Sequence, residues 1–334
     1  MRAVIGSVVV DVLGAAACGW ALVRTQSASA GAGALVLAAS AATLALLVLG
    51  GRRSRRRHED GHPLGYGREG YFWGFLAGVL LPVGAAAACI ADGVRRIDEP
   101  RDLEDLELVL GALGGAWLLS ALALWLVARA ARRARGDVAL RRYLRRSPHP
   151  ELPAAWLLGT GAVVALLAAG GAVGAAHATE DARWDAVGTL VVGGLLVVLA
   201  LLVAGTMKAL LVGVAPDRKV RESVRAAIEI EPSVAELVHL RIQHVGPAEL
   251  VVGAKVSFLG DLSVAEVAAA VERVETSLRR AVPEARIVYI EPDVFATDLD
   301  EGALDPSDVI GRLPPELPTR RPAHLARAEQ DPPR

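Results

Sequence analysis

A few side chains able to bind a proton or a cation lie inside long apolar stretches of the sequence. Asp11 and Cys18 fall in the first stretch, and Cys89 and Asp92 fall in the third. An ionisable group deep in an apolar segment is costly, so it faces a cavity or a partner, or it lies at a wet boundary. For Asp11 both alternatives stay open, whereas Asp92 is expected at a wet boundary, near the end of its stretch. The two cysteines are expected to be small core residues.

The sequence carries no pattern that predicts enzymatic chemistry. It has no nucleophile beside a base, no glycine-rich phosphate loop and no Cys/His spacing typical of zinc sites. We therefore expect no enzyme and no resident cofactor.

The elements that position these side chains are membrane spans. The 334 residues are 53% hydrophobic with a mean hydropathy of +0.40, values that a water-soluble domain rarely reaches. Apolar segments of roughly 20 residues are long enough to cross a bilayer. Six such segments are predicted, near residues 3–23, 30–50, 72–94, 106–128, 153–176 and 186–212, within a membrane domain of residues 1–213.

Arginines are concentrated in alternate loops, and this pattern predicts the orientation. Loops rich in Arg stay on the cytoplasmic side of a membrane, so both termini are predicted in the cytoplasm, most simply at a plasma (inner) membrane. Beside membrane spans such clusters indicate lipid contact rather than nucleic-acid binding. The arginines are Arg52, Arg53, Arg55, Arg56, Arg57 and Arg68 after the second span, and Arg129, Arg132, Arg133, Arg135, Arg141, Arg142, Arg145 and Arg146 after the fourth.

A separate small domain is predicted over residues 214–294, where helical and alternating patterns follow one another. Asp217 can cap a helix, residues 237–245, 249–258 and 286–291 read as strands, and Ser263 with Glu266 forms a capping box before a second helix. Residues 295–334, rich in Pro, Arg and acidic residues, cannot bury a core and are predicted to be a disordered tail.

One stretch is specific enough to indicate a family. Its residues are His62, Pro63, Leu64, Gly65, Tyr66, Gly67, Arg68, Glu69, Gly70, Tyr71, Phe72 and Trp73. Physics alone favours an aromatic belt at the membrane boundary for the ring-bearing residues. The order of residues, however, resembles the signature of the cation diffusion facilitator family, with departures only at Leu64 and Gly70.

The resemblance implies a fold, a substrate and a site. The family consists of divalent metal/proton antiporters, with six transmembrane helices, a cytoplasmic ferredoxin-like α/β domain that forms a homodimer, and a cation such as zinc as substrate. The family's metal ligands map to Val36 and Ser40 in the second span and to Ala155 and Gly159 in the fifth. None of these side chains is a carboxylate or an imidazole, so the only substitute candidates are Asp11 and Asp92.

Two functions follow from this combination. The first is a cation/proton antiporter that exports a divalent metal. The alternative is a transport-inactive relative, which acts as a membrane-anchored dimer on a partner such as a related transporter. Because all four mapped positions are neutral, we expect them to face one another as a small apolar centre without metal.

The orientation can be tested at Ser54, which lies in the first Arg-rich loop. In a cysteine-free background, Ser54→Cys is expected to react with a membrane-impermeant thiol reagent only from the cytoplasmic side of oriented vesicles. Labelling from the opposite side would contradict the predicted topology.

Overall fold

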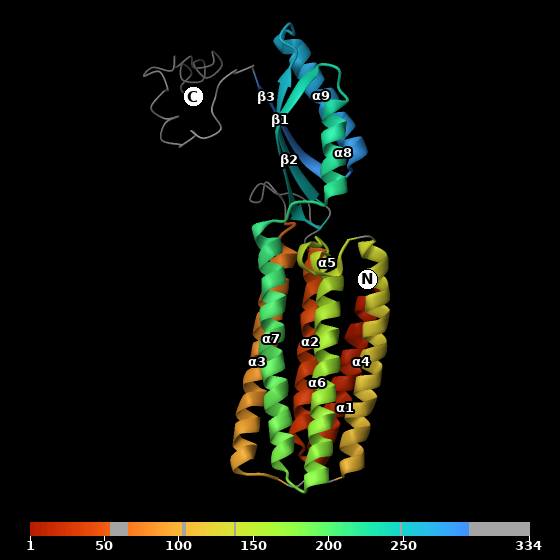
Figure 1. The fold of residues 1–334 in the computed structure, drawn as a ribbon, viewed down its shortest axis with the longest axis vertical. Helices are drawn as coiled ribbons and strands as arrows, with labels where there is room; N and C mark the ends of the chain where they lie inside the picture. Colours follow the sequence, from red (N-terminus) through yellow and green to blue (C-terminus); the bar gives the residue numbers. More distant parts are fainter. Residues whose placement is uncertain (54–65, 102–104, 137, 248, 294–334) are drawn as a thin grey trace, which may run out of the picture.

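The computed structural model describes residues 1–53, 66–101, 105–136, 138–247 and 249–293 (Figure 1). Ser54, His62, Pro63, Gly65 and the predicted tail lie outside these residues. A long helical bundle forms one part of the molecule, and a small α/β domain lies beyond one end of it.

Six helices of the bundle are long and apolar enough to cross a membrane, as predicted. A short helix, α5 (Leu140–Arg146), lies at the end of the bundle nearest the α/β domain. The six long helices are α1 (Arg2–Thr25), α2 (Ala28–Arg53), α3 (Glu69–Asp98), α4 (Leu106–Arg135), α6 (Glu151–Thr179) and α7 (Arg183–Val212).

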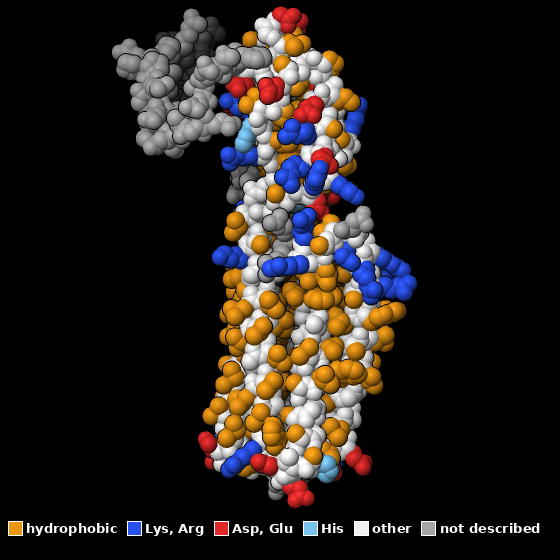
Figure 2. Space-filling model, viewed as in Figure 1, with side chains coloured by type: hydrophobic (Ala, Val, Ile, Leu, Met, Phe, Trp, Pro, Cys, Tyr) orange, Lys and Arg blue, Asp and Glu red, His pale blue; other side chains and the backbone are white. Residues whose placement is uncertain are grey.

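Apolar side chains cover the outside of the bundle over most of its length, and Lys and Arg gather at the end facing the α/β domain (Figure 2). Leu118 and Leu201, for example, are 64% and 68% exposed, which suits a surface in contact with lipid. In hydrocarbon each backbone polar group needs an internal partner, and continuous helices supply it. The chain is thus a multi-pass membrane protein.

Helix α2 is the most enclosed of the six. In its most apolar stretch 61% of the residues are buried, compared with 28% in α1 and α4. Its side chains contribute to two buried clusters along the bundle. One contains Val36 and Leu37 with Leu166 of α6, and the other contains Leu44 of α2 with Ala155 of α6. Because α2 is enclosed by the other helices, its side chains can form a site at the centre of the bundle.

Glycines permit close helix contacts at some positions in the spans and not at others. A Cβ added at Gly188 would lie 2.2 Å from Ala172, and one at Gly193 would lie 2.8 Å from Ile90. A Cβ added at other glycines of the spans would meet nothing within 4 Å, among them Gly111, Gly114, Gly115, Gly170, Gly171, Gly174 and Gly194. Composition predicts that spans can approach closely, but it does not identify which face does so.

The α/β domain consists of α8 (Arg218–Glu229), β1 (Val234–Gly246), β2 (Glu249–Phe258), α9 (Val264–Ala281) and β3 (Ala285–Asp293). The sheet order is β1-β2-β3, with β1 antiparallel and β3 parallel to β2. This chain order matches the ferredoxin-like βαββαβ order without its first strand.

Both helices of the α/β domain cover the same face of the sheet. Val224 of α8 and Val274 of α9 pack with Val252 and Val256 of β2 in one buried core. The predicted capping box of Ser263 and Glu266 is present. Asp217 occupies the N-cap position of α8, but its side chain makes no capping hydrogen bond.

Candidate functional site

The positions expected to carry metal ligands are filled by small or apolar residues inside the bundle. Val36 and Ser40 on α2 are each 2% exposed, and Ala155 on α6 is 1% exposed. Gly159 is placed differently, since a Cβ added there would lie 3.4 Å from Leu124 of α4 and near nothing on α2. The structure thus brings Gly159 toward α4, while Val36 and Ala155 belong to different buried clusters.

One carboxylate reaches this part of the bundle, and it comes from α1. The hydroxyl of Ser40 donates a hydrogen bond to Oδ2 of Asp11 over 2.6 Å, and Asp11 is only 3% exposed. Of the two alternatives for Asp11, the structure favours the buried group with a partner. Ser40 stands at a position where the resemblance implies a metal ligand on α2, whereas the acidic group beside it comes from α1.

The chemistry available to Asp11 and Ser40 is limited. One carboxylate and one hydroxyl can hold a proton, but a divalent transition metal is usually held by three or four N, O or S ligands that replace its water. Among the residues that the structure describes, no group of three or more His, Cys, Asp or Glu side chains is arranged to hold a metal ion. Cys18 and Cys89 are free and buried, as expected for core residues.

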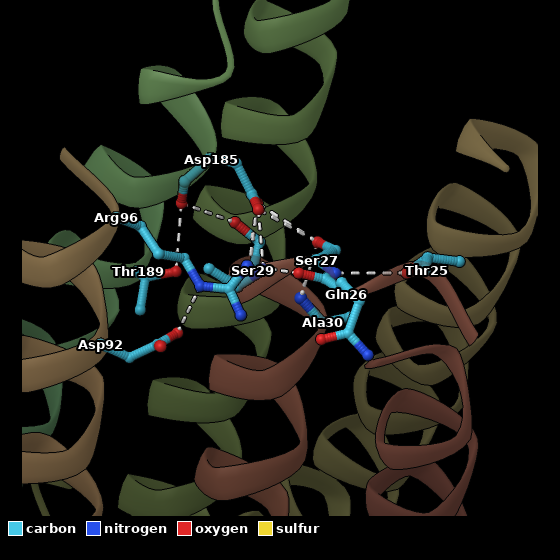
Figure 3. Close-up of polar contacts among 10 residues, drawn as sticks. Thr25, Gln26, Ser27, Ser29, Ala30, Asp92, Arg96, Asp185 and Thr189 are labelled. Atoms are coloured by element: carbon cyan, nitrogen blue, oxygen red, sulfur yellow. Dashed lines mark hydrogen bonds and ion pairs between the residues drawn. The ribbon is translucent and has the colours of Figure 1, made fainter. Parts of the chain in front are cut away.

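Asp92 lies at the end of the bundle far from the α/β domain and is engaged by a neighbour on its own helix. Nε of Arg96 lies 3.0 Å from Oδ2 of Asp92, whose side chain is 39% exposed. Arg96 also donates to the backbone carbonyl of Gln26 (Figure 3). Such a partly exposed ion pair is what the wet-boundary interpretation of Asp92 predicts.

Asp185 at the start of α7 holds the start of α2, a role that sequence reasoning did not assign. One carboxylate oxygen accepts from the backbone N–H of Ala28 at 2.7 Å, and the other accepts from that of Ser29 at 3.0 Å. The hydroxyl of Ser27 lies 3.3 Å from both oxygens (Figure 3). The first N–H groups of a helix have no intrahelical partner and bind an acidic group well. Asp185 therefore positions the helix that carries Val36 and Ser40.

The described part of the signature stretch joins the bundle to the α/β domain. A Cβ added at Gly67 would lie 2.5 Å from the carbonyl oxygen of Val245 and 2.8 Å from Cα of Gly246, at the end of β1. Only a residue without a side chain permits this approach of backbones. Glu69 accepts from Nε1 of Trp73, within the first turns of α3.

The aromatic-belt interpretation holds for Phe72, which is 50% exposed, but not for Tyr71, which is 1% exposed. The hydroxyl of Tyr71 donates to the carbonyl of Pro148 over 2.7 Å and so ties α3 to the segment before α6. A buried tyrosine with a bonded hydroxyl is a packing residue rather than an interfacial anchor. Tyr66 and Arg68 precede α3 in the turn that carries Gly67.

His244, near the end of β1, lies at the same junction. Its backbone N–H donates to the carbonyl of Val214, yet its buried Nδ1 has no hydrogen-bond partner among the described residues. Burial lowers the pKa of His244, the nearby His149 lowers it further and Asp217 raises it.

Comparison with known proteins agrees with this architecture. The family model of the cation efflux transmembrane domain matches residues 4–211. That match spans more than half of the chain and all six long helices, in agreement with a multi-pass membrane protein. The chain belongs to the cation efflux family of metal transporters, and the family expected from the signature is confirmed.

Curated relatives resemble most of this chain but are longer. Metal tolerance protein C4 of Arabidopsis thaliana is 26% identical over 225 residues, which are 67% of this chain and 49% of that protein. The mitochondrial proton-coupled zinc antiporter SLC30A9 of Xenopus laevis is 28% identical over 246 residues, 72% of this chain and 43% of that protein. The chain therefore spans about half the length of these relatives.

Among solved structures, a variant of the MamM CTD in its nickel form aligns over its full length with 24% of this chain. The sequence identity is 16% and the TM-score is 0.23.

Replacing the anchoring carboxylate tests its role. Asp185→Asn keeps the shape but leaves one of the two backbone N–H groups without its acceptor, so the free energy of unfolding is expected to fall by about 1.5–3 kcal/mol. Thermal unfolding of the purified protein in detergent measures the change. Asp181→Asn is the control, because Asp181 is exposed and bonds only its own loop at Arg183. Equal destabilisation by both variants would contradict the assignment.

Proposed function

We propose that this protein is a transport-inactive member of the cation efflux family, which acts as a membrane-anchored dimer on a partner such as a related transporter. The observation that supports this most is the composition of the centre: Val36, Ser40 and Ala155 are buried where ligands are expected. Removing a dication from water without ligands to replace its hydration is strongly unfavourable. The proposal places both termini in the cytoplasm at a plasma (inner) membrane.

A second candidate is cation/proton antiport through a displaced ligand. The contact of Ser40 with Asp11 favours it, because a buried ionisable group within a membrane bundle is usually functional. Zinc, which one relative's name states as its substrate, is the natural ion to test. The two candidates differ in whether the unmodified protein moves zinc at all.

Zinc flux distinguishes the candidates. In sealed vesicles containing the purified protein, zinc uptake and zinc-driven proton flux are expected to equal those of empty vesicles, since one carboxylate and one hydroxyl do not replace the hydration of the ion. Zinc flux that Asp11→Asn abolishes and Asp92→Asn preserves would overturn the inactive proposal and establish Asp11 as the ligand. Flux lost only with Asp92→Asn would place the ion at the far end of the bundle.

Restoring ligands gives a positive control for the same assay. Val36→His and Ser40→Asp lie four residues apart on one face of α2, and the second lies beside Asp11. Together with Asp11 they supply three ligands, so this double variant is expected to bind zinc at micromolar concentrations. Adding Asp11→Asn to the double variant is expected to remove that binding. Zinc binding that persists without Asp11 would show that the ion is held elsewhere.

The proposed dimer is supported by a sheet face that no helix of the described domain covers. Ile287 and Tyr289 of β3 alternate with the core residues Val288 and Ile290, and Tyr289 is 63% exposed. Wild-type protein in detergent is expected to sediment as a dimer, and Tyr289→Glu is expected to shift it toward monomer. Val264→Glu, on α9 at a residue that is 88% exposed, is the matched control. A monomer at all concentrations would contradict the dimer.

A further inference from the structure

A cavity lies where the bundle meets the α/β domain. It measures about 460 Å³ and is lined by the start of α1, by the end of α4, by α5, by the segment leading into α6 and its start, and by Asp217 before α8. That volume is in the usual range for a small-molecule site. The cavity is separate from Asp11 and Ser40, neither of which lines it.

The lining contains both signs of charge. Arg135 of α4 and Arg142 of α5 are cationic, and Glu151 of α6 and Asp217 are anionic. The pKa of Tyr143, which also lines the cavity, is raised first by burial and also by the charge of Glu151. A ligand matched to this lining carries a negative and a positive group.

Arg135 carries a donor that the described residues leave unused. Its Nη1 donates to the carbonyl of Val138 over 2.9 Å, whereas its Nε is buried without a hydrogen-bond partner among the described residues. Unsatisfied buried donors are rare in folded proteins, and an ion, a water or a ligand commonly explains them. Guanidinium groups bind phosphate oxygens with charge-assisted hydrogen bonds.

The position of the cavity indicates the source of such a ligand. Lys and Arg side chains gather at this end of the bundle, directly beyond the apolar surface (Figure 2). This is the level at which lipid headgroups meet a membrane protein. Val4, Ala134 and Leu152 add an apolar wall, suited to the upper part of an acyl chain.

We propose that this cavity binds the phosphoethanolamine headgroup of a membrane phospholipid. The phosphate lies with Arg135 and Arg142, and the primary ammonium lies with Glu151 and Asp217. A phosphatidylglycerol headgroup satisfies the arginines alone. A phosphatidylcholine headgroup carries a quaternary ammonium that cannot donate a hydrogen bond to a carboxylate.

The test compares three lipids on the full chain in detergent, by native mass spectrometry and thermal unfolding. Phosphatidylethanolamine is expected to be retained most and to raise the melting temperature above that seen with phosphatidylcholine. Arg135→Gln is expected to weaken binding of phosphatidylethanolamine and phosphatidylglycerol about tenfold, the loss of roughly one charge-assisted hydrogen bond. Glu151→Gln is expected to weaken phosphatidylethanolamine alone.

Two further variants on α4 test whether the effect is specific to Arg135. Arg132→Gln, exposed on the same end of α4 and outside the cavity lining, is expected to leave retention unchanged. Arg135→Lys preserves charge and solubility if the glutamine variant does not fold, and is expected to show intermediate binding. Equal losses in the Arg132 and Arg135 variants, or equal retention of all three lipids, would overturn the proposal. Protection by soluble glycerophosphoethanolamine without lipid would overturn the membrane source.

Discussion

The arrangement of the bundle depends on how the start of α2 is satisfied. Four N–H groups at the start of any helix lack partners within it, and here that start is enclosed by other helices, where water cannot supply acceptors. The carboxylate of Asp185, at the beginning of α7, accepts hydrogen bonds from two of these N–H groups. A single side chain thereby fixes the depth of the central helix relative to its neighbour, and with it the level of every residue on α2.

Because the level of α2 is fixed, the neutral residues at the centre of the bundle occupy defined positions. In this scaffold the Asp185 contact, the turn at Gly67 and the α/β domain are all present, while the mapped ligand positions hold neutral residues. The acidic group beside them, Asp11, comes from another helix and accepts a hydrogen bond from a hydroxyl. The architecture is thus separable from the ion chemistry, as expected when stability comes from packing and function from a few side chains.

Much of the fold could be predicted because it rests on patterns that repeat along the chain. Six apolar runs, the alternation of β2 and the capping box of Ser263 each depend on local sequence. The contacts across helices could not be predicted in the same way. Asp11 pairs with Ser40 across 29 positions of sequence and Asp185 with Ala28 across 157, and no periodicity encodes such partners.

The errors have the same physical origin. Tyr71 lies beside the exposed Phe72, yet helix rotation directs it inward to Pro148, so composition at a boundary could not separate anchor from core. Gly159 was expected to face α2 across the bundle, but helix packing directs it to Leu124 of α4. In both cases the residue lies in the predicted helix. The direction in which it points is set by neighbours that lie far away in the sequence.

The meeting of Gly67 with Val245 and Gly246 has a consequence for how this protein can diverge. Because backbone touches backbone at this one contact, no compensating side-chain substitution could restore the fit there. Side chains such as Gln243, which donates to the carbonyl of Val212, join the two parts elsewhere. Chimaeras that exchange the α/β domain between relatives should therefore keep their two halves in register only where both glycine positions are transferred intact.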